Sequence, residues 1–220
     1  MSVPIHSLNV PYYSARAREY ERVYAKPERQ AELQVLRSVI PAFFSDRTVL
    51  EVACGTGYWT QYIAESARTI CATDLSQDTL EMAKLKQLNS DRVRFAIADA
   101  MALPMDLGLF DSAFCGFWWS HISRKAIPAF LTSLHARLVP GAKVVLLDNL
   151  YVEGSSTPIS RRSDDGDTYQ QRLLSDGASY EVLKNFPTEG ELRSDLDVGA
   201  LRVRYTSLQY YWYVEYEVAA

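Results

Sequence analysis

The segment Thr48–Thr60 constrains the fold of this chain more than any other stretch of its 220 residues. Five residues of strand character, 48–52, run into a turn of small residues, 53–57, and a helical pattern then opens at Tyr58. Glycines in such a turn permit positive φ angles and let a ligand approach the main chain closely. The first turn of the following helix offers N–H groups that have no partner within the helix. The segment therefore predicts a ligand-binding strand–turn–helix unit in an α/β fold.

The turn is a poor match to the dinucleotide fingerprint Gly-x-Gly-x-x-Gly. Gly55 and Gly57 would require a third glycine at position 60, where this chain has Thr60. Glu51, in contrast, is an acid inside an apolar strand, and a buried carboxylate needs hydrogen bonds or a cationic partner. The pattern Glu-x-Ala-x-Gly-x-Gly resembles the first motif of class I S-adenosylmethionine-dependent methyltransferases, which usually has glycine where this chain has Ala53.

Acids also follow the next two predicted strands. A strand at 68–74 ends at Asp74, which lies 74 − 51 = 23 residues after Glu51, and a strand at 92–98 is followed by Asp99-Ala100. In nucleotide-binding α/β folds, an acid at the first of these places accepts hydrogen bonds from ribose hydroxyls. Asp99-Ala100 resembles the third methyltransferase motif, in which the acid accepts the adenine amino hydrogen and the next N–H meets the ring.

Later elements resemble the same family and complete the expected fold. Phe110-Asp111 opens a fourth strand, Pro140-Gly141 turns into a fifth, and two β-rich runs around Thr206-Ser207 predict a C-terminal hairpin. The resemblance implies an α/β, Rossmann-like, seven-stranded and mostly parallel sheet with helices on both faces and an antiparallel last strand. We expect one domain over 1–220, with a helical lid at 1–44, a cofactor-binding half at 45–150, and a substrate-side insertion and hairpin at 151–220.

The N-terminal segment carries a stripe of tyrosines. Tyr13, Ala17, Tyr20 and Tyr24 fall on one face of a helix, and a second helix is expected to stop at Pro41. Such a striped helix can simply pack on the sheet. It also resembles the N-terminal segment that folds over the cofactor as a lid in small-molecule methyltransferases.

Composition narrows the range of partners. The net charge of −4 leaves no basic surplus for binding nucleic acid. No apolar run approaches the ~18 residues that a membrane span needs. The N-terminus shows no secretory signal, and three cysteines without Cys-x-x-Cys spacing suit a reducing compartment. We expect a cytoplasmic monomer or homodimer that acts on a small-molecule acceptor.

The resemblance also implies a set of site residues. The cofactor would be S-adenosyl-L-methionine, and no His, Asp and Glu cluster argues for a metal. Its binding residues would be Tyr12, Tyr20, Glu51, Ala53, Gly55, Gly57, Asp74, Leu75, Asp99, Ala100 and Phe117. For the acceptor we expect Tyr13, Trp118, Trp119, Arg161 and Arg162, although the aromatic residues would also suit a core and the arginines a solvated surface.

The predicted reaction is S-adenosylmethionine-dependent methyl transfer to an oxygen or nitrogen of a small molecule by direct SN2 displacement. His121 is the histidine nearest the predicted site, so it is either the general base or a packing residue. Two alternatives stay open at this point. One is an NAD(P)-dependent oxidoreductase on a similar sheet, and the other is a catalytically inactive cofactor-binding homologue, for which Ala53 is the only support.

Overall fold

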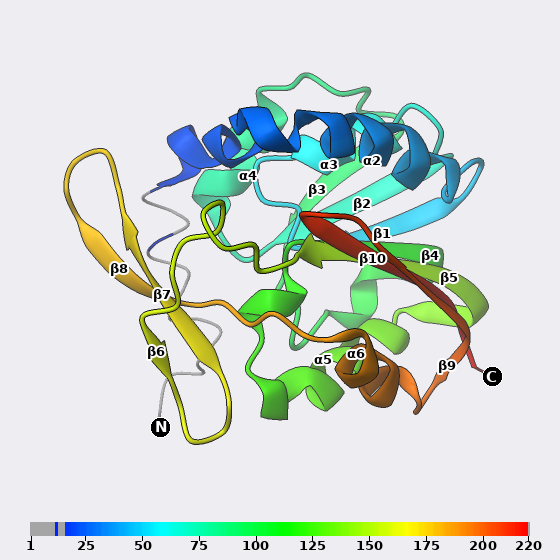
Figure 1. Cartoon of the computed structure of the whole chain (residues 1–220). Coiled ribbons are helices and arrows are strands. Elements are labelled where there is room, and N and C mark those ends of the chain that lie inside the picture. The colour runs from blue at the N-terminus through cyan, green and yellow to red at the C-terminus, as the bar shows by residue number, and fades with distance from the viewer. Residues whose placement is uncertain (1–11, 13–15, 220) are drawn as a thin grey trace.

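A seven-stranded sheet forms the centre of the structure, with the strand order β3-β2-β1-β4-β5-β10-β9 (Figure 1). The computed structural model describes residue 12 and residues 16–219. Strands β1 to β5 pair in parallel, whereas β10 is antiparallel to both β5 and β9. The expected sheet with an antiparallel last strand is therefore confirmed. Its strands are β1 Thr48–Val52, β2 Thr69–Asp74, β3 Val93–Ile97, β4 Phe110–Gly116, β5 Leu138–Asn149, β9 Ala200–Ser207 and β10 Tyr211–Val218.

Helices cover both faces of this sheet because alternate strand residues are apolar on each face. On β4, for example, Phe114 packs with residues of α2 and α3, while Ala113 and Cys115 pack with residues of α5 and α6. Among the described helices none is long and apolar enough to cross a membrane. The α-helices are α2 Gln30–Ala42, α3 Tyr58–Ile63, α4 Gln77–Lys84, α5 Ile127–His135 and α6 Glu189–Leu196.

Local sequence signals explain where several helices begin. Ser76 caps α4 through its hydroxyl, which accepts the Thr79 N–H at 3.4 Å, and Thr188 forms a reciprocal capping box with Glu191 at the start of α6. Short 3₁₀ turns join the remaining elements. They are η2 Ala17–Ala25, η3 Pro27–Arg29, η4 Met105–Leu107, η5 Trp119–His121 and η6 Arg124–Ala126.

The insertion after β5 folds as a small antiparallel sheet of its own. It consists of β6 Arg161–Arg162, β7 Thr168–Leu173 and β8 Ser179–Leu183, in that order. In Figure 1 this sheet projects from one side of the main sheet, beside the end of η2. The N-terminal helical segment and the insertion therefore lie on the same side of the molecule.

One helix type and two boundaries differ from the sequence prediction. The tyrosine-striped segment forms the 3₁₀ helix η2 where an α-helix was expected. Helix α2 includes Pro41 and ends one residue later, since a proline in the last turn removes only one hydrogen bond. Thr206-Ser207 belongs to β9, and the chain reverses at 208–210, where the Leu208 N–H donates to the Tyr211 carbonyl at 2.8 Å.

The prediction for Pro140-Gly141 needs a smaller correction. Both residues lie inside β5, which begins at Leu138, so they do not precede the strand. The pairing between β4 and β5 shifts register between Phe110 and Ser112, and Gly141 has a φ of 76°. The predicted turn is therefore an irregularity within a longer strand.

Candidate active site

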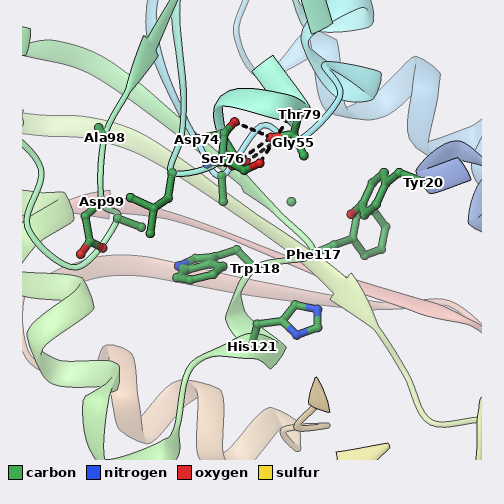
Figure 2. A pocket seen from close by; sticks show the side chains of 14 residues that line it. Tyr20, Gly55, Asp74, Ser76, Thr79, Ala98, Asp99, Phe117, Trp118 and His121 are labelled. Carbon is green, nitrogen blue, oxygen red and sulfur yellow. Dashed lines mark hydrogen bonds between the residues drawn. The ribbon is translucent and has the colours of Figure 1, made fainter. Parts of the chain in front are cut away.

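A pocket of about 700 Å³ lies where β1, β2, β3 and β4 end (Figure 2). Carboxyl ends of parallel strands are the usual ligand-binding edge of such sheets. Of the residues predicted for the cofactor, eight line this pocket. The lining residues are Tyr20, Ala53, Gly55, Asp74, Leu75, Ser76, Thr79, Ala98, Asp99, Ala100, Gly116, Phe117, Trp118 and His121.

The turn after β1 has three residues in the left-handed conformation. Ala53, Gly55 and Gly57 have φ angles of 54°, 56° and 73°. Ala53 therefore adopts a backbone conformation that favours glycine, which is the residue found there in the usual motif. Gly57 does not line the pocket; it precedes α3, and a Cβ at this position would lie 3.1 Å from the Ala83 Cβ. Its role in the structure is close packing of the turn against α4.

Asp74 ties this turn to the start of α4. Its carboxylate accepts hydrogen bonds from the Gly55 N–H at 2.9 Å, the Ser76 N–H at 2.9 Å and the Thr79 hydroxyl at 3.1 Å, as Figure 2 shows. Burial raises the pKa of Asp74, while these hydrogen bonds act in the opposite direction. The side chain thus fixes the glycine turn as well as facing the pocket.

Apolar and aromatic groups form the rest of the wall. Leu75 is 39 % exposed beside Asp99 and Ala100, and Phe117 has a φ of 59°. Trp118 also belongs to this pocket, although we predicted it for the acceptor, and its indole N–H is buried without a hydrogen-bond partner among the described residues. Ala53 and Phe117, both with positive φ angles, line the same pocket, and strained backbone residues cluster at functional sites.

Helix η2 is fastened over the turn by contacts that the tyrosine stripe does not reveal. Glu21 accepts a hydrogen bond from the Thr56 hydroxyl at 2.9 Å and pairs with Lys86 at 2.7 Å. The Tyr24 ring stacks on the Tyr58 ring with 3.6 Å between centroids and 7° between planes. Together these contacts hold the η2 segment, whose Tyr20 lines the first pocket, against the turn, the start of α3 and the loop after α4.

A second pocket of about 730 Å³ adjoins the first one. Tyr20, Phe117 and His121 line both pockets, so these three side chains form their common wall. The second pocket also receives residues from η2, η3, the loop after β5, and β7. Its other lining residues are Tyr12, Arg16, Val23, Tyr24, Lys26, Arg29, Asn149, Ser155, Ser156, Thr157, Gln170, Arg172, Lys184, Phe186 and Tyr211.

His121 is buried in this common wall. Its Nδ1 lies 2.7 Å from the Leu183 carbonyl oxygen, and because a carbonyl only accepts, Nδ1 carries the proton and Nε2 is the acceptor nitrogen. Burial lowers the pKa of His121 to about 3, and the nearby charge of Lys184 acts in the same direction. His121 is therefore a neutral imidazole at neutral pH.

A buried ion pair lies behind His121. The Lys184 Nζ donates to the Asp148 carboxylate at 3.0 Å and to the Ser120 hydroxyl at 2.6 Å, and Asp148 also accepts the Ser120 N–H at 3.0 Å. Burial opposes ionisation of Asp148, but the charge of Lys184 and the hydrogen bonds from the Ser120 and Asn149 N–H groups hold its pKa below the ordinary value. This network connects β5 and the residue that follows β8 to the η5 turn.

Several predicted residues lie elsewhere in the structure. Glu51 is 2 % exposed beneath the turn, and burial raises its pKa to about 8. Trp119 is buried against Phe130, with ring centroids 6.3 Å apart. Tyr12 lines the second pocket, not the first, and Tyr13 is outside the described residues.

The predicted basic pair of the insertion also lies outside both pockets. Arg161 and Arg162 are exposed on β6, and Arg161 pairs with Glu181 at 2.7 Å. The cations that do line the second pocket were missed, because Lys26, Arg29 and Lys184 are isolated charges without any local motif. Only the tertiary fold brings them together.

Sequence similarity and structural similarity to known proteins indicate the same family. Residues 49–141 match the family described as "Methyltransferase domain". Demethylmenaquinone methyltransferase of Staphylococcus epidermidis is 32 % identical over 105 residues, which are 45 % of this chain and 42 % of that protein. The chain thus spans less than half the length of that relative.

Similarity to solved structures extends over the whole chain. DhpI in complex with SAH is 25 % identical, covers 100 % of this chain and 99 % of its own, and superposes with a TM-score of 0.81. The DhpI-SAM-HEP complex gives a TM-score of 0.77 over 98 % of this chain and 99 % of its own.

Proposed function

Since the chain belongs to the class I S-adenosylmethionine-dependent methyltransferases, we propose that it methylates an oxygen or nitrogen of a small molecule by direct SN2 displacement. The cofactor is S-adenosylmethionine, which supplies a methyl group activated by its sulfonium sulfur. The protein's part is then to align a nucleophile and to exclude water. The arrangement of two adjoining pockets supports this division of tasks.

The first pocket fits the cofactor in three respects. Gly55 has no side chain, and within the described part of the chain the nearest group to the place where a Cβ would lie is the Tyr20 ring, 3.8 Å away. The carboxylates of Asp74 and Asp99 are acceptors for ribose hydroxyls and for an adenine amino group. The buried indole N–H of Trp118 needs an acceptor that the described residues do not supply, and a bound ligand would provide one.

The observation that carries the proposal is the common wall of Tyr20, Phe117 and His121. An acceptor in the second pocket would meet the methyl group at this wall. Aromatic faces there attract a cationic sulfonium, and the buried position keeps water away. Burial raises the pKa of Tyr20 to about 12, so this phenol stays neutral and can donate a hydrogen bond.

His121 would serve the nucleophile as a proton acceptor. Its Nδ1–H is directed at the Leu183 carbonyl, which fixes the tautomer and leaves Nε2 as the basic nitrogen. A neutral imidazole can accept a hydrogen bond from an acceptor O–H or N–H. Because a pKa of about 3 makes His121 a weak base, it can take the proton only as methylation turns the acceptor into a much stronger acid. His121→Gln is expected to lower kcat more than it weakens cofactor binding.

The test measures cofactor binding and turnover separately. Calorimetry should show binding of S-adenosylmethionine and of its demethylated product, and no comparable binding of NAD. A panel of small-molecule acceptors should then give acceptor-dependent formation of S-adenosylhomocysteine. Failure to bind S-adenosylmethionine, or binding without turnover across a broad acceptor panel, would contradict the proposed activity.

A further inference from the structure

The second pocket has an unusual charge for a protein whose net charge is −4. Five of its lining side chains are cationic, and no Asp or Glu is among the described residues that line it. Of the five, Lys184 has the buried Asp148 as a partner. The cationic residues are Arg16, Lys26, Arg29, Arg172 and Lys184.

Arg29 is the most buried of these five cations. Its side chain is 4 % exposed, and it donates to the Ser155 hydroxyl at 3.0 Å and to the Asn149 side-chain oxygen at 3.0 Å. Both acceptors are neutral, and among the described residues no carboxylate lies within ion-pair distance of this guanidinium. The guanidinium also lies over the Tyr210 ring, 5.0 Å from its centroid. A buried charge that has only neutral partners is costly.

The neighbouring cations increase this cost. Lys26 donates to the Ser155 carbonyl, and Arg172 donates to the Thr157 hydroxyl at 2.9 Å and to the Gln170 side chain at 2.6 Å. Burial lowers the pKa of Lys26, and the charges of Arg29 and Arg172 lower it further, partly offset by Glu28. Three positive groups from η2–η3 and β7 thus converge on one chamber, and their mutual repulsion would be relieved by a bound anion.

We propose that the acceptor of this enzyme carries an oxyanion, of the carboxylate or phosphate type, which Arg29, Lys26 and Arg172 bind in the second pocket. The inference rests on the proposed function. Arginine and lysine match both oxyanions by charge-assisted hydrogen bonds, and the planar fork of Arg29 favours a bidentate contact. Because His121 and Tyr20 line the same chamber, an acceptor held by its oxyanion also lies beside the wall shared with the cofactor pocket.

The experiment uses the full chain saturated with S-adenosylhomocysteine and three probes of similar size. Benzoate and phenylphosphonate carry the two kinds of oxyanion, and benzamide is their neutral counterpart. Isothermal titration should show that at least one anion binds at least ten times more tightly than benzamide. The affinity for that anion should fall as salt is added. The ratio between the two anions identifies which type the site prefers.

Variants assign the binding to the named cations. Lys26→Gln and Arg172→Gln, both at partly exposed positions, should each weaken anion binding ten-fold or more. Lys143→Gln is the matched control, because Lys143 is also partly exposed but lies on β5 outside the pocket, over the Phe43 ring. Arg29→Lys keeps the charge but removes the planar fork. We expect it to weaken binding of the preferred anion about as strongly as Lys26→Gln and Arg172→Gln do.

Two results would overturn this inference. One is that neither anion binds better than benzamide, and the other is that the pocket variants bind the anions as the Lys143 control does. If only this inference is wrong, the chain still binds S-adenosylmethionine and still methylates a neutral acceptor. Failure of the proposed function would show in the unmodified chain as absence of S-adenosylmethionine binding, or as binding without turnover on any acceptor, charged or neutral, so the two are distinguishable.

Discussion

Ala53 offers a direct measurement of the strain that the first pocket imposes on the backbone. Its φ of 54° is in the left-handed region, which costs a residue with a Cβ about 1–2 kcal/mol. Ala53→Gly removes this cost. The same substitution also raises the entropy of the unfolded chain, by about 0.5–1 kcal/mol, and removes a half-buried methyl group.

Ala64→Gly isolates the strain from these other effects. Ala64 is also half-buried beside an apolar cluster and follows α3 closely, but its φ is −62°, an ordinary helical value. Both variants lose one methyl group and gain the same backbone freedom. The difference between their unfolding free energies therefore reports the left-handed conformation, and we expect Ala53→Gly to be the more stable by about 1–2 kcal/mol.

Thermal and urea unfolding of the two variants measure this difference. For a chain of this length, each kcal/mol shifts Tm by about 2–4 °C, so their midpoints should differ by about 2–8 °C. Equal midpoints, or a higher midpoint for Ala64→Gly, would show that the Ala53 conformation is not strained. The backbone conformation at position 53 would then not explain why the usual motif has glycine there.

Three further predictions concern ionisable groups. Burial raises the pKa of Glu51 to about 8 from 4.5, so its contribution to stability is present below pH 4.5 and is lost as the pH rises through about 8. Urea unfolding should show that Glu51→Gln loses less stability than the parent protein between those pH values. Asp74→Asn should weaken S-adenosylmethionine binding by about 1–3 kcal/mol in calorimetry, because charged hydrogen bonds to the turn are replaced by weaker ones. Lys184→Met should cost about 3–5 kcal/mol in urea unfolding, whereas adding Asp148→Asn should recover part of that loss, since a lone buried carboxylate would no longer remain.

The cofactor half of the site could be predicted because its signals are local in sequence. The turn after β1 and the acids at 74 and 99 follow their strands directly, and parallel strands bring these positions to one edge of the sheet. The conformation of Ala53 could not be predicted in the same way, because no glycine marks the left-handed position. Similarly, an irregular 3₁₀ turn after β4 gives no period that would tell Trp118, in the pocket, from Trp119, in the core.

The acceptor half could not be predicted because its contacts join distant segments. The hydrogen bond from Lys26 to Ser155 spans 129 positions, and that from Arg29 to Asn149 spans 120. Arg161 and Arg162 were predicted for the acceptor as an adjacent basic pair, yet β6 is a two-residue edge strand whose side chains are both exposed. Isolated cations such as Arg29 become recognisable only when the fold encloses them.

The position of the family match explains which properties similarity can transfer to this chain. It covers residues 49–141, and this range contains every described residue of the first pocket except Tyr20. All five cations of the second pocket, at positions 16, 26, 29, 172 and 184, lie outside it. The match to the Staphylococcus epidermidis enzyme, which covers 42 % of that protein, therefore supports a common cofactor but gives no information on the acceptor. Segments before and after the matched range enclose the acceptor pocket, so the family match does not identify the substrate, and our inference about it rests on the charges that those segments bring together.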